Sequence, residues 1–69
     1  AMVTHEHTDP TSGKLHIVNL DNAAYVELER DSAHIRVVFT DGTEVTLFFA
    51  SAETAKTGYI QLRRKMEGV

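Results

Sequence analysis

The sequence contains no cysteine, no tryptophan and a single proline. Without cysteine the chain forms neither disulfides nor thiolate zinc sites, two common means of stabilising a small domain. Its 69 residues suffice for one domain, and a chain of this length buries roughly 60% of the surface that its unfolded state exposes. A metal bound through histidine or carboxylate, or an oligomer, remains as the further source of stability. We expect a homo-oligomer, either a dimer or a tetramer, and no cofactor.

An excess of positive charge and a long hydrophobic run are also missing. The formal net charge of −3 provides no basic surface of the kind that nucleic acids and anionic membranes require. No segment has the length of a membrane span, and no basic stretch followed by an apolar one resembles a signal peptide. We therefore expect a cytoplasmic protein without membrane association. Ala1 before Met2 is typical of a cloning remnant, so we expect the natural chain to begin at Met2.

Four segments with strand character follow a polar N-terminal stretch. Residues 1–13 include Pro10 and Gly13 and have no sustained period, which indicates a tail or linker. β-Branched and aromatic residues are frequent in four later segments, which turn signals separate: 14–20, 23–30, 33–40 and 44–49. Connections this short force neighbouring strands to be antiparallel. The pattern predicts a four-stranded antiparallel meander.

Residues 50–69 have a helical period. Apolar residues recur at spacings of three and four, at Ala52, Ala55, Tyr59, Leu62 and Met66. Ser51 is suited to the N-cap and Gly68 to the end of the helix. Gly58 inside the helix costs about 1 kcal/mol relative to alanine, so we expect it to loosen or break the first half. The whole chain is then of the α+β class, and residues 14–69 form a single ββββα domain with the helix on one face of the sheet.

The turn around Asp41 and Gly42 determines the register of the last two strands. A slip of one residue would turn every side chain to the other face, so apolar residues must share a face. A two-residue Asp41-Gly42 loop would mix the faces. A three-residue loop from Thr40 to Gly42, with Gly42 left-handed and forming a bulge, pairs Val37 with Val45 and is the predicted turn.

The two earlier loops are predicted to be two residues long. The first, Asp21-Asn22, pairs Ile17 with Val26. The second, Asp31-Ser32, pairs Val26 with Val37 and Ala24 with Phe39. The predicted core face then contains Leu15, Ile17, Ala24, Val26, Leu28, Ile35, Val37, Phe39, Val45, Leu47 and Phe49.

The opposite face of this sheet carries a second set of apolar residues. Because they would be adjacent on neighbouring strands, they indicate an interface rather than chance exposure. The tail folding back over them, with Val3 among its residues, is the alternative. The predicted interface consists of Val18, Leu20, Tyr25, Val38 and Phe48.

Metal binding and catalysis have little support in the sequence. His5 and His7 are alternate residues of an extended segment and would project the same way, and imidazole suits zinc, copper or nickel. Two ligands do not make a site, so we predict no metal site and retain His5 and His7 as candidates only. The sequence has no glycine-rich phosphate loop, HExxH or GxSxG motif. We therefore expect a protein that is not an enzyme.

Basic residues near the end of the helix suggest an alternative, nucleic-acid binding. Arg63, Arg64 and Lys65 are consecutive, and Arg36 would lie on the outer face of the sheet beside Glu27. The simpler explanation is that cations near a helix C-terminus favour the macrodipole and keep the outer surface solvated. Nucleic acid is therefore not the expected partner.

The run LDNAAYVELERDSAHIRVVFTDGTEVTL, residues 20–47, resembles small bacterial proteins of unknown function that have an LDNxAYxE opening and a central DG turn. Over about half of the domain it also resembles the strand section of LytTR DNA-binding domains. LytTR domains are longer, and their base-contacting loops lie in parts that this chain lacks, so the resemblance does not imply DNA binding. The order of four strands and one helix is similar to the repeat of Whirly-type single-strand-binding proteins.

The sequence thus favours a small, non-catalytic protein-interaction module. We expect it to self-associate through the outer sheet face or an edge strand, with a heterologous protein partner as a further possibility. The alternative is a nucleic-acid-binding transcriptional regulator or single-strand binder that uses Arg36, Arg63, Arg64 and Lys65.

Overall fold

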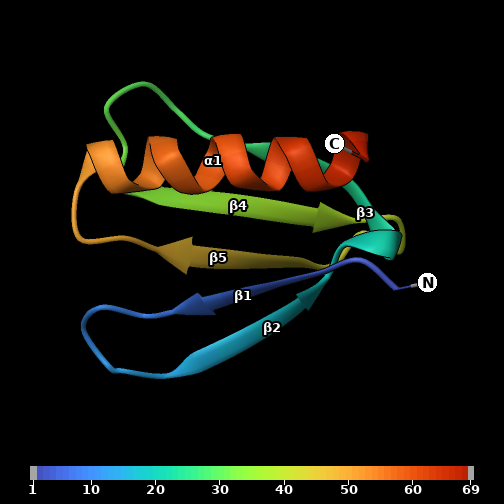
Figure 1. The fold of residues 1–69 in the computed structure, drawn as a ribbon, viewed down its shortest axis with the longest axis horizontal. Coiled ribbons are helices and arrows are strands. Elements are labelled where there is room, and N and C mark those ends of the chain that lie inside the picture. Colours follow the sequence, from blue (N-terminus) through green and yellow to red (C-terminus); the bar gives the residue numbers. More distant parts are fainter. Residues whose placement is uncertain (1, 69) are drawn as a thin grey trace.

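The computed structural model describes residues 2–68 as an α+β fold of five strands and one long helix (Figure 1). In chain order the elements are β1 (Thr4–Thr8), β2 (Leu15–Asn19), the 3₁₀ turn η1 (Leu20–Asn22), β3 (Ala23–Glu27), β4 (His34–Phe39), β5 (Glu44–Phe48) and α1 (Ala52–Glu67). None of the helices in this part of the chain is long and apolar enough to span a membrane.

The strands form two antiparallel sheets rather than one meander of four strands. β1 and β2 make a two-stranded sheet, which we call the N-terminal hairpin, and β3, β4 and β5 make a three-stranded sheet in that order. The expectation of a single four-stranded sheet is therefore wrong. Residues 4–8, inside the segment predicted as a tail or linker, form β1, because their backbone pairs with β2 from Thr4 opposite Asn19 to Thr8 opposite Leu15.

The chain leaves the N-terminal hairpin at η1. The side chain of Asn19 accepts a hydrogen bond from the backbone N–H of Asp21 at 2.9 Å, which stabilises a 3₁₀ turn where a two-residue hairpin loop was predicted. The Leu20 N–H donates to the carbonyl of Val3 at 2.9 Å. The predicted pairing of Ile17 with Val26 is therefore wrong.

The turn between β4 and β5 has the predicted geometry. The Phe39 N–H donates to the Thr43 carbonyl at 2.8 Å, and Gly42 has a φ of +88°, a value that L-residues rarely adopt. Val37 lies opposite Val45. The three-residue loop and the register that follows from it are confirmed.

The connection between β3 and β4 is longer than predicted. Val26 lies opposite Val37 as expected, but an irregularity between Ala23 and Tyr25 puts Ala23, not Ala24, opposite Phe39. β3 ends at Glu27, and residues 28–33 form the loop. The predicted two-residue loop is wrong.

The core lies between the three-stranded sheet, α1 and the inner face of the N-terminal hairpin. Its central side chains are fully buried: Ile35, Val37, Leu47 and Leu62. Val18 and Leu20 are part of the same cluster. Two residues predicted for the core, Leu15 and Ile17, are instead 67% and 75% exposed. The alternation along β2 is thus opposite to the expected one, since Val18 rather than Ile17 faces inward.

Both ends of α1 match the sequence prediction. The Ser51 side chain accepts from the Thr54 N–H at 3.2 Å, and the Thr54 hydroxyl accepts from the Ser51 N–H at 3.1 Å, which is a reciprocal capping box. Gly68 ends the helix with a φ of +79°, where its N–H bonds to carbonyls of the last turn.

Gly58 does not loosen α1, contrary to expectation, because it allows the helix to approach the sheet closely. A Cβ atom on Gly58 would lie 2.6 Å from Cε2 and 2.7 Å from Cζ of Phe49, which is inside van der Waals contact. Gly58 is buried, and the helix continues through it from Ala52 to Glu67. The cost in helix propensity is therefore offset by packing against the Phe49 ring.

Replacing Gly58 with alanine should destabilise the protein although alanine is the better helix former. The helix gains about 1 kcal/mol in propensity, but the clash with Phe49, at about 1–3 kcal/mol, should outweigh it, for a net loss of up to about 2 kcal/mol. Urea unfolding followed by circular dichroism measures this change. In a Phe49→Leu background the same substitution should cost less, since the ring is absent. Net stabilisation by Gly58→Ala in the otherwise unchanged chain would contradict the close contact.

Candidate interaction surface

The five residues predicted as an interface do not form one surface. Val18 and Leu20 are buried in the core, and Val38 is also buried. Tyr25 and Phe48 are exposed at 49% and 52% and lie on the outer face of the three-stranded sheet. The assignment of Val18 and Leu20 to an outer face is therefore wrong. The alternation of β2 is reversed at Val18, and Leu20 lies in η1, where it is part of the core.

A charged row separates the two exposed aromatic residues. Arg36 on β4 forms an ion pair with Glu27 on β3 and another with Glu44 on β5, the latter at 3.0 Å. The expected pairing of Glu27 with Arg36 is confirmed, and the hydrogen bond that Arg36 donates to the Glu27 carboxylate raises the pKa of Arg36. In the ladder the row of Glu27 and Arg36 lies between the row of Tyr25 and that of Phe48. The outer face of this sheet is thus polar at its centre.

The outer face of the N-terminal hairpin carries the two most exposed large apolar side chains of the described strands. Leu15 and Ile17 are both on β2 and point to the same side, since alternate residues of a strand share a face. The residues opposite them on β1 are Thr8 and Glu6. Sequence reasoning missed this surface because it assigned Leu15 and Ile17 to the core.

β2 is also an edge strand. It pairs with β1 on one side, and within residues 2–68 no strand pairs with its other side. Such an edge presents unpaired backbone N–H and C=O groups to another chain. The exposed aliphatic face and the open edge therefore belong to the same five residues, Leu15–Asn19.

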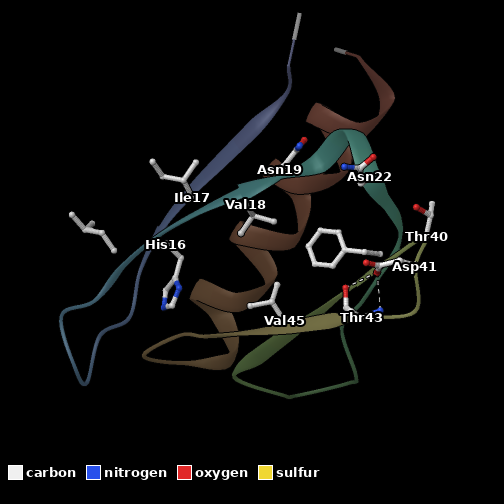
Figure 2. A pocket seen from close by; sticks show the side chains of 11 residues that line it. His16, Ile17, Val18, Asn19, Asn22, Thr40, Asp41, Thr43 and Val45 are labelled. Carbon is white, nitrogen blue, oxygen red and sulfur yellow. Dashed lines mark hydrogen bonds between the residues drawn. The ribbon is translucent and has the colours of Figure 1, made fainter.

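A groove of about 700 Å³ lies beneath β2. His16 and Val18 point into it from β2, Val45 points into it from β5, and Ile17 points away (Figure 2). Asp41 and Thr43 line its far end, where the Thr43 hydroxyl donates to the Asp41 carboxylate at 2.6 Å. The hydrogen bonds from Thr43 lower the pKa of Asp41, so this end of the groove is anionic at neutral pH.

The inner face of β1 carries two buried histidines, His5 and His7, with exposures of 5% and 8%. The Nε2–H of His7 donates to the carbonyl of Phe48 at 2.7 Å, and the His7 ring lies 4.5 Å from the Phe49 ring, centroid to centroid. Nδ1 of His5 lies 3.2 Å from Nζ of Lys65. Burial lowers the pKa of His5, and the charges of Lys65 and His7 lower it further.

Both candidate metal ligands, His5 and His7, take part in packing between elements. Each imidazole contacts a group of another element, β5 for His7 and α1 for His5. Among the residues that the structure describes, no three His, Asp or Glu side chains gather into a group that could hold a metal ion. Their role in this structure is to hold the N-terminal hairpin against the rest of the fold.

The basic residues named for nucleic-acid binding lie on different surfaces. Arg36 is on the outer face of the three-stranded sheet, whereas α1 packs on the inner face, where Gly58 approaches Ile35. Arg63 pairs with Glu67 at 3.3 Å, and Lys65 donates to the Thr4 carbonyl at 3.2 Å. Arg64 is exposed in the last helical turn. The geometry therefore assembles no common basic patch from these four residues.

Comparison with known proteins adds no relative: no protein-family model, no curated protein and no solved structure matches the chain. The resemblances to small bacterial proteins, to LytTR domains and to Whirly-type repeats stay predictions. The candidate site therefore rests on the geometry of β2.

The orientations of β2 and η1 predict which of two leucines supports the fold. Leu20→Ala should destabilise the protein by about 2–4 kcal/mol, because it leaves a cavity in the core. Leu15→Ala should change the free energy of unfolding by less than about 0.5 kcal/mol, since that side chain is exposed. Urea unfolding at low protein concentration, where association does not contribute, gives both values. Equal losses for the two variants would contradict the observed orientation.

Proposed function

We propose that the protein is a small, non-catalytic interaction module that self-associates through β2. The observation that carries the proposal is the exposure of Leu15 and Ile17 on a strand that is paired on one side only. An aliphatic surface beside an open backbone edge offers both apolar contact and hydrogen bonding to a second strand.

The composition of β2 supports this role. Natural edge strands usually avoid pairing through lysine, proline, a bulge or a covering loop. The sequence LHIVN of β2 has no lysine and no proline, and its ladder with β1 is regular from Leu15 to Asn19. The edge thus lacks the usual features that prevent another chain from pairing with it.

A second copy of the chain fits this surface by symmetry. Two β2 strands that pair antiparallel across a two-fold axis form a four-stranded sheet, β1-β2-β2-β1. Residues of one phase then share one face, so Leu15 and Ile17 of both copies contact one another across the axis. A domain of this length also gains stability from the additional burial.

Substituting lysine for Ile17 should weaken self-association without unfolding the chain. The charge would lie at the centre of the proposed contact, and lysine on an edge strand opposes pairing. We expect the dissociation constant of the dimer to rise at least about tenfold, which corresponds to about 1.4 kcal/mol. Sedimentation equilibrium over a concentration series measures it, and circular dichroism verifies that the variant is folded.

Phe48→Lys is the matched control, because Phe48 is similarly exposed but lies on the outer face of the three-stranded sheet. This variant should associate as the unsubstituted chain does. A dimer lost in Phe48→Lys and retained in Ile17→Lys would move the interface to the other sheet. A monomer at all concentrations in the unsubstituted chain would overturn self-association altogether.

A further inference from the structure

The N-terminal hairpin is attached to the rest of the fold by contacts that differ from those inside each sheet. We call β3, β4, β5 and α1 the body of the protein. An isolated two-stranded hairpin is at best marginally stable in water. The hairpin therefore depends on docking against the body, where its only covalent continuation within the described residues is η1.

His5 and Lys65 form the contact between β1 and α1. Lys65 Nζ lies 3.2 Å from the Thr4 carbonyl and 3.2 Å from Nδ1 of His5. A lysine ammonium only donates hydrogen bonds, so Nδ1 of His5 must accept and His5 must be the neutral imidazole. A doubly protonated ring has no acceptor, and it would place a second positive charge beside Lys65.

Among residues 2–68, no carboxylate compensates this arrangement. The charged and titratable groups that influence His5 are Lys65 on α1 and His7 on β1, and both oppose a positive charge. On β2 the residue opposite His5 is Val18. Three acidic residues lie on β1 and the elements near it. Asp21 of η1 accepts from the Val3 N–H at 3.1 Å, and Glu67 of α1 pairs with Arg63. Glu6 is exposed on the other face of β1.

We propose that His5 makes docking of the N-terminal hairpin dependent on pH, so that its protonation breaks the contact with Lys65 and releases the hairpin from the body. Release exposes the inner face of β2, including Val18, while the three-stranded sheet and α1 stay packed. The device acts on the hairpin of a single chain and does not require self-association.

The direction of the pH dependence follows from the two states of His5. In the released hairpin His5 is exposed and has the ordinary pKa of about 6.5, whereas docking lowers its pKa. Above pH 6.5 both states hold a neutral imidazole, and docking does not vary with pH through this group. Below pH 6.5 the released state binds the proton more readily, so the ratio of docked to released hairpin falls by up to tenfold per pH unit.

Amide hydrogen exchange between pH 8 and pH 5.5 tests this inference, with mass spectrometry of peptic fragments at low protein concentration. Protection factors corrected for intrinsic exchange should fall in β1 and β2 below about pH 6.5 and stay constant in β4 and β5. His5→Gln, whose side-chain oxygen can accept from Lys65 and cannot titrate, should remove this dependence. His34→Gln, an exposed histidine of β4, is the matched control and should leave it unchanged.

A second measurement covers the case in which His5→Gln does not fold. The imidazole of His5 in the unsubstituted chain can be titrated directly by NMR, and its midpoint should lie below 6.5 and coincide with the loss of hairpin protection. The inference is overturned if His5 takes up its proton while the hairpin stays protected, or if His5→Gln loses protection over the same pH range and to the same extent.

Discussion

The position of the Phe49 ring is the constraint on which the other contacts depend. The ring lies against Gly58, where even a methyl group on the helix would clash. Its centroid also lies 4.5 Å from that of the His7 ring. One side chain directly after β5 therefore sets the distance of α1 from the three-stranded sheet and gives the N-terminal hairpin a surface to dock on. A hydrogen bond from the Phe49 N–H to the Ala33 carbonyl, at 2.8 Å, ties this junction to the residue before β4.

The N-terminal hairpin provides burial that three strands and one helix lack. Its inner face contributes Val18 to the core, and η1 contributes Leu20. The same face buries two imidazoles, which is costly unless their polar atoms find partners. The Phe48 carbonyl and the Lys65 ammonium are these partners, and among the side chains of residues 2–68 that are not exposed, no buried nitrogen or oxygen lacks one. The hairpin is thus held by specific polar contacts as much as by apolar area.

Features that depend on residues close together in the chain were predictable from the sequence. The docking of the N-terminal hairpin was not. The β4–β5 register follows from the left-handed Gly42, and the ends of α1 follow from Ser51 and Gly68, because each depends on residues a few positions apart. β2 is different, since its apolar residues occupy both phases, Ile17 in one and Val18 in the other. Which phase is buried depends on β1, whose inward residues are histidines and so carry no apolar alternation. The prediction assumed that β2 pairs with β3, the next strand along the chain. That assumption selected the wrong phase of β2 for the core, and therefore the wrong candidate interface.

The two proposals concern opposite faces of one hairpin, and the period of a β-strand connects them. Leu15 and Ile17 face outward because Val18 faces inward. The inward orientation is maintained by docking, in which His5 and Lys65 take part. A released hairpin has no body to hold its inner face, so its outer face loses the fixed geometry that pairing with a second copy requires. Protonation of His5 would therefore oppose self-association without touching the interface, and the coupling would be reciprocal, since association through β2 would favour the docked, neutral state of His5.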